Sequence, residues 1–367
     1  MSAARPVAVP PIFTALRPNS KRGIMRKSTG VFAIALAAAA LVSADDRTGK
    51  AEGGPQARKE AKQATPRLGV QTPGVQIPFA NLKAEAEVPA APGWIGVTDS
   101  LLLPSAKSTL DRLDLKTNKL ADPIAGIEQP CGGAVTAFGS IWVPSCATQS
   151  LVRIDPKTWK VTTQVPTGIS SAQPALAATA DSVWVLSDNK TTLSRVDPDQ
   201  NGVVAEIRLP ANCNTLTFGE AALWVTCPAD DRLLRINPQT NLVEKSIEVA
   251  GRPDALAIGE GSIWVYCRKE GHLERIDPKT NKSTKTIDTG VPGVSGAIAI
   301  GLGSVWLTQE GFPLTRIDPQ TDKVAQQFWG AGGGAISIAA NSLWLSNLSL
   351  KTLWRIDPKR VTATLAE

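Results

Sequence analysis

His272 is the only histidine of the chain, and Glu270 stands two residues before it. An imidazole titrates near neutral pH, and a nearby carboxylate can orient it as a general base. The pair lies where a loop enters a segment that alternates like a strand, so a half-exposed strand histidine is the simpler interpretation. We expect no catalytic residue in this protein, and the pair His272 and Glu270 is the alternative.

Oxygen donors that could hold a metal ion are sparse in the segments that should line a central axis. Asp254 and Asn214 are the obvious donors there, whereas a calcium ion takes about six to eight oxygen ligands. The sequence also has no Gly-x-Ser-x-Gly elbow, no Walker-type phosphate loop and no Cys-x-x-Cys-His haem attachment string. We therefore expect no metal and no cofactor, with magnesium or calcium as the alternative.

Cysteine spacing indicates a disulfide framework. The five cysteines are Cys131, Cys146, Cys213, Cys227 and Cys267. The first four form two pairs at equivalent places, each pair flanking one predicted hairpin, and neighbouring antiparallel strands can meet bridging geometry. The spacing predicts the bridges Cys131–Cys146 and Cys213–Cys227, with Cys267 as a free thiol. Zinc is the competing interpretation, but no histidine or Cys-x-x-Cys spacing accompanies these residues.

A repeated unit of about 40 residues positions all of these groups. The clearest copy runs from Gly261-Ser262-Ile263-Trp264-Val265 to Leu273-Glu274-Arg275-Ile276-Asp277-Pro278. The aromatic position holds Trp142, Trp184, Trp224, Trp264, Trp306 and Trp344, with Leu102 in the first copy. The arginine position holds Arg112, Arg153, Arg195, Arg235, Arg275, Arg316 and Arg355. Because every copy carries them, we interpret these tryptophans and arginines as structural.

Each unit divides into four short strands separated by turns. In the fifth copy they span about 254–258, 262–266, 272–277 and 283–287, and an Asp-Pro-Lys-Thr-Asn turn follows the third. Four-stranded antiparallel units at this period are typical of propeller blades. The sequence predicts an all-β, seven-bladed β-propeller of four-stranded antiparallel blades. Either the strand 361–365 or the strand 82–88 would complete the last blade.

The N-terminal region has the composition of an export signal. Residues 1–44 hold six basic residues and no acid, and subtracting six from the 39 bases leaves 33 against 33 acids. A basic stretch, the apolar run 31–42 and a Val-Ser-Ala site predict a signal peptide over 1–44, with Met25 as a possible true start. An uncleaved anchor is the alternative. A disordered linker over 45–80 and a propeller over 81–367 would follow, without a transmembrane helix in the mature chain.

The units Gly-Ser-Ile-Trp-Val and Arg-Ile-Asp-Pro-Lys-Thr resemble repeats of the YVTN/NHL-type and streptogramin lyase-like propeller superfamily. The resemblance covers roughly residues 80–367 and implies the propeller fold. Members of such families include lyases, lactonases, redox enzymes and binding modules. Streptogramin lyases use histidine and glutamate near a magnesium ion in the central cavity, and His272 with Glu270 is the only match. Gluconolactonase-like propellers hold calcium on the axis, where this chain offers Asp254 and Asn214.

The loops between second and third strands, and the connections entering each first strand, should share one face. They carry Asp188, Asn189, Asp230, Asp231, Arg232, Arg252, Arg268, Lys269, Glu270, Gln309, Glu310 and Asn347, and Trp329 would be an exposed anchor beside them. Variation on a repeated frame is where repeat proteins place recognition, so we predict ligand-binding residues among these. Ordinary solvated loops are the alternative.

These patterns together predict a secreted or periplasmic, non-catalytic recognition module. Its ligand would be a protein, peptide or glycan, and we expect a monomer. The neutral mature chain lacks the basic stripe typical of nucleic-acid binding. The alternative function is a lyase or lactone hydrolase with a divalent metal in the central cavity.

Overall fold

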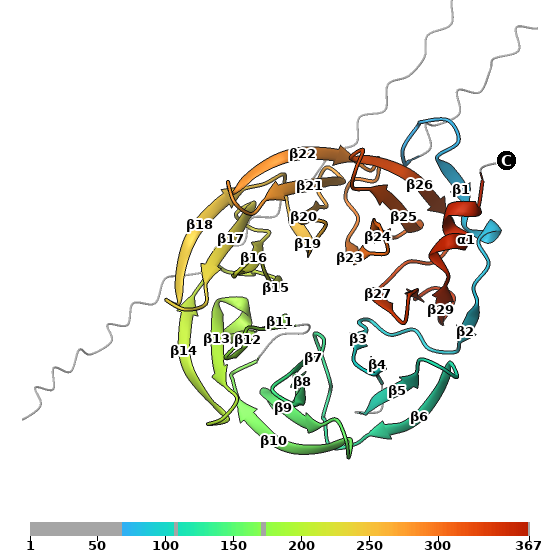
Figure 1. Cartoon of the computed structure of the whole chain (residues 1–367). Helices are drawn as coiled ribbons and strands as arrows, with labels where there is room; N and C mark the ends of the chain where they lie inside the picture. The colour runs from blue at the N-terminus through green and yellow to red at the C-terminus, as the bar shows by residue number, and fades with distance from the viewer. Residues whose placement is uncertain (1–67, 106–108, 170–173, 366–367) are drawn as a thin grey trace, which may run out of the picture. The chain divides into compact units, whose positions relative to one another are not determined.

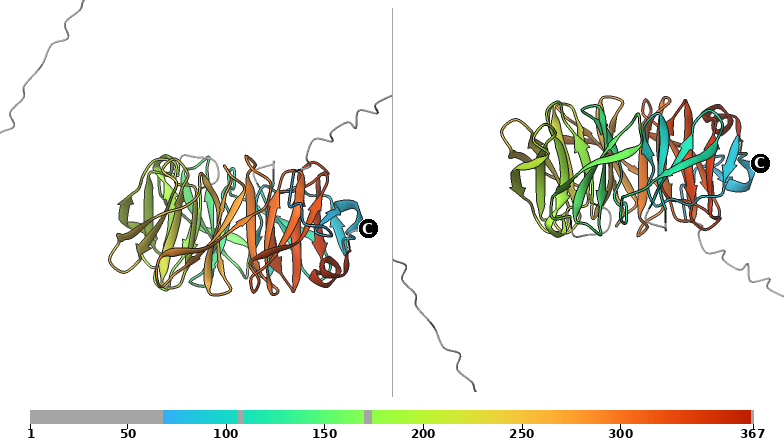
Figure 2. Two further views of the ribbon diagram at one scale, coloured as in Figure 1. Left: turned by 90° about the horizontal axis from the view of Figure 1, so that it is seen from above. Right: turned by 90° about the horizontal axis from the view of Figure 1, so that it is seen from below.

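The computed structural model describes residues 68–105, 109–169 and 174–365, which form a ring of seven radial sheets around a central opening (Figure 1). Seen from the side, the strands of the sheets run between the two faces of the ring (Figure 2). The prediction of a seven-bladed all-β propeller is confirmed. The predicted signal peptide and most of the predicted linker lie outside the described residues. No helix in the described ranges is long and apolar enough to cross a membrane.

In blades one to five the first strand lies nearest the axis and the last lies outermost, whereas strands from the N-terminal side of the chain lie outermost in blades six and seven (Figure 1). Blades one and two consist of β3 (Gly96–Val97), β4 (Ser100–Pro104), β5 (Leu110–Asp114), β6 (Lys119–Ile124), β7 (Val135–Ala137), β8 (Ser140–Ser145), β9 (Ser150–Asp155) and β10 (Lys160–Pro166). Blades three and four consist of β11 (Leu176–Ala178), β12 (Val183–Ser187), β13 (Thr192–Asp197), β14 (Gly202–Arg208), β15 (Thr215–Gly219), β16 (Ala222–Cys227), β17 (Arg232–Asn237) and β18 (Leu242–Glu248).

The remaining blades follow the same order. Blades five and six consist of β19 (Pro253–Gly259), β20 (Ser262–Cys267), β21 (His272–Asp277), β22 (Lys282–Asp288), β23 (Gly296–Gly301), β24 (Ser304–Gln309), β25 (Phe312–Asp318) and β26 (Lys323–Trp329). Blade seven contains β27 (Ile336–Ala339), β28 (Ser342–Asn347) and β29 (Thr352–Ile356). Strands within these blades pair antiparallel.

A strand from the N-terminal side of the chain completes the seventh blade. β2 (Ala86–Val88) pairs antiparallel with β29, placing Ala86 opposite Arg355. Of the two alternatives predicted for closure, the strand at 82–88 is therefore the one observed, and a strand at 361–365 is wrong. Those C-terminal residues follow Asp357 into α1 (Pro358–Ala363), whose first turn is capped by the Asp357 carboxylate accepting from the Lys359 amide.

The sequence explains why the last Asp-Pro begins a helix rather than a turn. In the fifth blade the corresponding turn ends at Asn281, which adopts a left-handed φ of 58°. The equivalent position after Asp357 is Val361, and a β-branched residue strongly disfavours that conformation. Proline at the first helical position and aspartate at the N-cap favour a helix instead.

A further strand widens the sixth blade beyond the predicted four. β1 (Gln76–Pro78) pairs parallel with β26, so that this sheet has five strands, and the short 3-10 helix η1 (Phe79–Asn81) follows it. Residues 68–80, which we assigned to the linker, thus pack on the propeller. Gln327 holds this segment: its Oε1 accepts from the Val70 amide at 2.8 Å and its Nε2 donates to the Thr289 carbonyl at 2.9 Å.

The repeated tryptophans fill the spaces between blades. All six are fully buried, as is Leu102 in the first blade. Trp264, for example, packs with Val305 and Leu307 of the next blade, and its Nε1 donates to the Gly259 carbonyl at 3.1 Å. Large aromatic surfaces removed from water at each contact stabilise the ring. The prediction that the tryptophans wedge between neighbouring blades is confirmed.

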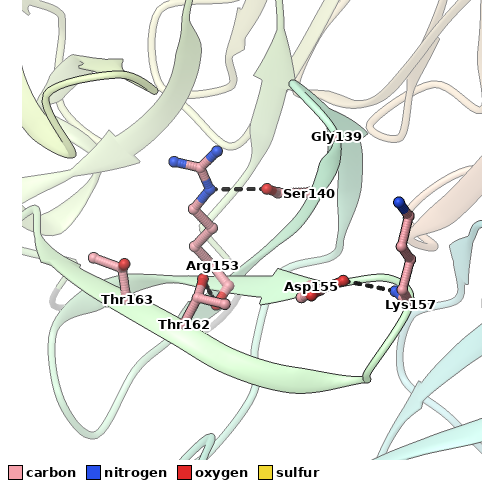
Figure 3. Close-up of a pocket in the computed structure, with 7 residues that line it drawn as sticks. All are labelled: Gly139, Ser140, Arg153, Asp155, Lys157, Thr162 and Thr163. Atoms are coloured by element: carbon pink, nitrogen blue, oxygen red, sulfur yellow. Dashed lines mark hydrogen bonds between the residues drawn. The ribbon is translucent and has the colours of Figure 1, made fainter.

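The repeated arginines connect each blade to the next. The contacts with the following blade's turn are Arg153 with Asn201, Arg195 with Asn241, Arg235 with Asn281, Arg275 with Asp322, and Arg355 with Asn118. Arg112 instead lies over the Trp159 ring, 4.4 Å from its centroid. Figure 3 shows Arg153 donating to Ser140 in a pocket of about 430 Å³ near these turns. The arginines are therefore structural, as the sequence predicts.

Arg316 does not contact a turn of the following blade. The turn that it would contact, after the third strand of blade seven, is replaced by α1. The guanidinium turns back to Gln326 of its own blade, and Nε donates to Oε1 at 3.0 Å. Gln326 in turn donates to the carbonyls of Val361 and Thr364, so the glutamine connects Arg316 to the end of α1.

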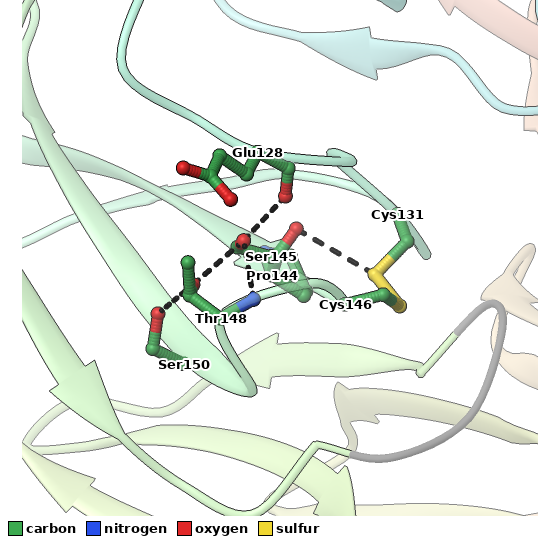
Figure 4. The surroundings of a disulfide bond; sticks show 7 residues. All are labelled: Glu128, Cys131, Pro144, Ser145, Cys146, Thr148 and Ser150. Carbon is green, nitrogen blue, oxygen red and sulfur yellow. Dashed lines mark hydrogen bonds between the residues drawn. A yellow bond between two sulfur atoms is a disulfide. The ribbon is translucent and has the colours of Figure 1, made fainter. Parts of the chain in front are cut away.

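Both predicted disulfides are present, and Cys267 is free and buried. Figure 4 shows the Cys131–Cys146 bridge beside Ser145, whose hydroxyl donates to the Glu128 carbonyl. The second bridge, Cys213–Cys227, joins the connection entering blade four to the end of β16. Each bridge fixes a connection that enters a first strand to the second strand of the same blade.

Candidate functional site

The two faces of the propeller differ in how much their loop sequences vary from blade to blade. One face carries the tight turns after first and third strands, which repeat from blade to blade. The other, which we call the variable face, carries the loops between second and third strands and the connections between blades. A cavity of about 1460 Å³ lies at this face near the axis. Its size is above the usual range for small-molecule pockets, about 300 to 1,000 Å³.

A carboxylate at the start of β19 lies in the cavity wall. The Asp254 side chain is only 15% exposed, and its Oδ2 accepts from the Gly296 amide at 3.2 Å. Its Oδ1 lies 3.7 Å from Nη1 of Arg268, which also donates to the Ser295 hydroxyl at 3.0 Å. The inner strand of blade five and the connection between blades five and six thus hold this pair together.

Lys190 reaches the same cavity from blade three. It ends the 3-10 turn η2 (Asp188–Lys190), in which three consecutive residues have left-handed φ angles of 45°, 53° and 62°. Such a run is rare for residues with a side chain. The Asp188 carboxylate stabilises the turn by accepting from Arg208 and from the Thr191 hydroxyl, both at 3.2 Å.

The Lys190 side chain is half-buried. Burial lowers the pKa of its ammonium group, and the Asp254 carboxylate opposes that shift. Desolvation disfavours the charged form of a lysine, and a nearby anion favours it. Lys190 and Asp254 therefore share one electrostatic environment although they come from different blades.

Asn214 lies in the wall beside Asp254. Its Nδ2 donates to the Asp254 carbonyl at 3.3 Å, and its Oδ1 accepts from the Thr226 hydroxyl at 2.6 Å. The Thr226 hydroxyl also bonds that of Thr215. The adjacent Cys213–Cys227 bridge holds the two segments that carry these residues.

The two oxygen donors that the sequence placed on the axis, Asp254 and Asn214, do not fit a divalent cation. Both oxygens of Asp254 already face positive or N–H partners, one of them the Arg268 guanidinium, and the Asn214 oxygen accepts from Thr226. Calcium and magnesium need several converging oxygen ligands. No group of three His, Cys, Asp or Glu residues that could hold a metal occurs within residues 68–105, 109–169 and 174–365.

The other side of the cavity is lined by glycine and apolar residues. The connection 330–335 between blades six and seven contributes Gly-Ala-Gly-Gly-Gly-Ala, and Leu348 of the next loop is 50% exposed. A Cβ on Gly332 would lie 2.7 Å from Oδ1 of Asn347, and one on Gly333 would lie 2.8 Å from the Gln309 carbonyl. Glycine is required here because the connection runs directly over the Asn347 side chain and the Gln309 backbone.

The structure brings only some of the predicted site residues to the cavity. Arg268, Gln309 and Glu310 line it, together with Asp254 and Asn214. The predicted residues that do not line it are Asp188, Asn189, Asp230, Asp231, Arg232, Arg252, Lys269, Glu270, Asn347 and Trp329. Trp329 is half-buried at the end of β26, because Pro78 of β1 pairs with it, and so it differs from the exposed anchor that we expected.

His272 and Glu270 also lie away from the cavity lining. His272 begins β21 and pairs with Cys267 of β20 and Asp288 of β22. The Glu270 carboxylate contacts Lys269 at 3.3 Å. Lys190 is the charged cavity residue that sequence reasoning missed, although its neighbours Asp188 and Asn189 were included. A Lys directly after Asp-Asn in a variable loop was the signal that could have found it.

The observations so far define a seven-bladed β-propeller with a polar cavity at its variable face. No protein-family model matches the chain, and no curated protein matches it. Solved structures with this fold include a streptogramin B lyase, with 18% identity and a TM-score of 0.62 over 73% of this chain and 94% of that one.

Two structures of virginiamycin B lyase from Staphylococcus aureus are similarly related. The selenomethionine-substituted enzyme is 16% identical, and a catalytically inactive variant with quinupristin is 15% identical. Both have TM-scores of 0.63 and cover 74% of this chain and 97% of their own. At these identities the likeness shows a shared fold.

Proposed function

We propose that this protein is an exported recognition module that binds a peptide, a protein segment or a glycan in the cavity of its variable face. The observation that carries the proposal is the convergence of Lys190, Asp254 and Arg268 from different loops on one cavity wall. These side chains are not part of the repeated frame, and non-repeated residues on a repeated frame are typical of recognition surfaces.

The chemistry of the wall favours binding over catalysis. Both oxygens of Asp254 are already engaged, one by the Gly296 amide and the other by the Arg268 guanidinium. Asn214 is fixed at both ends of its amide. Groups held this firmly present a fixed pattern of donors and acceptors to a ligand.

Export is supported by the two disulfides, which form and persist mainly in oxidising compartments. The sequence features of residues 1–44 agree with secretion or a periplasmic location. We propose that the mature chain works there as a monomer.

A cavity-filling variant tests the proposal. Ala331→Trp places an indole in the cavity wall, whereas Lys279→Trp, at an exposed turn between third and fourth strands, is the matched control. The three proteins are screened against a glycan array and a displayed peptide library. We expect ligands that bind the unmodified chain and Lys279→Trp but not Ala331→Trp. Ligands retained equally by Ala331→Trp, or an empty screen, would contradict cavity binding.

A streptogramin-type lyase is the second candidate, favoured by the fold shared with a structure that holds quinupristin. Incubation with quinupristin followed by liquid chromatography and mass spectrometry tests it. A lyase opens a bond without adding water, so its product keeps the substrate mass, whereas a hydrolase adds one water. We expect unchanged quinupristin. Turnover that His272→Ala abolishes would replace the binding proposal with the enzymatic one.

A further inference from the structure

We infer that the ligand of this cavity is an amphipathic carboxylate: an acidic group held by Lys190 and Arg268, joined to an apolar body that contacts the wall near Leu348. The inference rests on the proposed binding at this cavity and names one ligand chemistry, which the end of a peptide and a fatty acid share. Two features support it: Lys190 and Arg268 have N–H groups without a described hydrogen-bond partner, and the opposite wall around Leu348 is apolar.

The Lys190 ammonium group is the first observation. It lies in the cavity, half-buried, and makes no hydrogen bond or ion pair to any residue that the structure describes. A partly desolvated cation without a hydrogen-bond partner is unfavourable. The Asp254 carboxylate supplies opposite charge nearby but no hydrogen bond, and an anionic ligand group would supply the missing acceptor. The left-handed turn of η2, which the Asp188 carboxylate stabilises, fixes the backbone position of Lys190.

Arg268 is the second observation. Its contacts with Ser295 and Asp254 both use Nη1, and the longer of them, at 3.7 Å, is beyond hydrogen-bond distance. Nε and Nη2 make no bond with the described residues and are left for a ligand. A planar guanidinium matches the two oxygens of a carboxylate in a bidentate pair.

The balance of charges favours a singly charged anion over a doubly charged one. The cavity is lined by two cations, Lys190 and Arg268, and two anions, Asp254 and Glu310. Asp254 lies beside both cations, so the site offers no excess of positive charge for a phosphate of charge near −2. A carboxylate adds only one negative charge, so its repulsion by Asp254 and Glu310 is smaller than that of a phosphate.

The apolar wall is the third observation. Leu348 and Leu350, in the loop between β28 and β29, are 50% and 45% exposed. Leu348 lines the cavity with Ala331, Ala335 and Ile336. The η2 turn follows β12, and the leucine loop follows β28, on the opposite side of the ring (Figure 1). The ligand must therefore extend across the opening from the charged wall to the apolar one.

Matched probes test the inference by calorimetry. The pairs are N-acetyl-Ala-Ala-Leu with its C-terminal amide, and decanoate with decanol; glucuronate is an acid without an apolar body. We expect at least one apolar acid to bind at least tenfold more tightly than its neutral partner. The acid with the higher affinity, the peptide or decanoate, then distinguishes a peptide C-terminus from a fatty acid as the ligand. Lys190→Met should abolish this preference, whereas Lys285→Met, on the outer strand β22, should keep it.

Several results would overturn the inference. Equal affinity for acid and neutral partner, no measurable binding of either acid, tighter binding of glucuronate, or a preference that survives in Lys190→Met would each refute it. Thermal melting confirms that the variants are folded. A library ligand that Ala331→Trp excludes, but that shows no preference for an acid, would leave the binding function standing while this inference fails. If no ligand in the screens loses binding in Ala331→Trp, both the binding function and this inference are refuted.

Discussion

The contact between Arg275 and Asp322 provides the sharpest test of how neighbouring blades are held together. Nη1 of Arg275 donates to Oδ1 of Asp322 at 2.9 Å and to the Pro319 carbonyl at 2.8 Å, and Nε donates to the Ser262 hydroxyl at 2.8 Å. The guanidinium lies 5.1 Å from the centroid of the Trp264 ring. Replacement by methionine keeps apolar contact with the indole and removes these bonds, together with a longer one of 3.5 Å from Nη2 to the Glu260 carbonyl.

The expected magnitude follows from burial. Each side chain of the pair is 24% exposed, so solvent weakens the interaction only in part. A hydrogen bond to a charged group contributes about 1.5 to 3 kcal/mol, and the low end suits this pair. We expect Arg275→Met to lower the free energy of unfolding by about 3 kcal/mol, because a carbonyl and a hydroxyl also lose their donor. The coupling between Arg275 and Asp322 should be about 1.5 kcal/mol.

A double-mutant cycle measures that coupling. Asp322→Gly removes the carboxylate while tolerating the left-handed φ of 53°, and urea unfolding followed by tryptophan fluorescence gives each free energy. The control cycle uses Arg232 and Glu248, which lie 3.6 Å apart within one blade and are 39% and 80% exposed. Exposed pairs contribute about 0.5 kcal/mol or less. A coupling for Arg275 and Asp322 no larger than the control value would refute the role assigned to the repeated arginines.

Three further outcomes are expected. Tyr266 is the only tyrosine, and burial raises its pKa to about 12; absorbance titration should show this, and stability should fall as pH rises from about 10 through 12, because the unfolded chain releases the proton first. A titration midpoint near 10 in the folded protein would contradict the burial. Replacing Cys213 and Cys227 by serine should lower the free energy of unfolding by about 3 kcal/mol in urea, and an unchanged midpoint would exclude a stabilising bridge. Gln327→Leu should speed amide exchange at Val70, measured by mass spectrometry against Gln326→Leu, and equal exchange would show that Gln327 does not hold the segment.

The repeated parts of the fold could be predicted because each blade solves the same packing problem. The buried indole recurs in six blades and the Asp-Pro string in five, at one spacing, so the copies reinforce one interpretation. The features that sequence reasoning missed occur once. β1 adds a parallel strand beside Trp329, and Val361 diverts one Asp-Pro into a helix.

The cavity was harder to predict for the same reason. Lys190, Asp254 and Arg268 are separated along the chain and meet only because blades three and five face one opening. Asp254 and Arg268 were identified because their positions within the repeat are regular. Lys190 depends on a run of three left-handed non-glycine residues that no other loop among the described residues contains, and no periodic pattern marks it.

The pairing of β2 with β29 has a consequence for how the molecule is made. A ribosome synthesises β2 before any complete blade, whereas β29 emerges only after six blades have followed. The strand β2 therefore stays without its partner β29 for almost the whole of synthesis. A chain that ends before β29 would form an open arc of blades with unpaired strand edges, and such edges can pair with other chains.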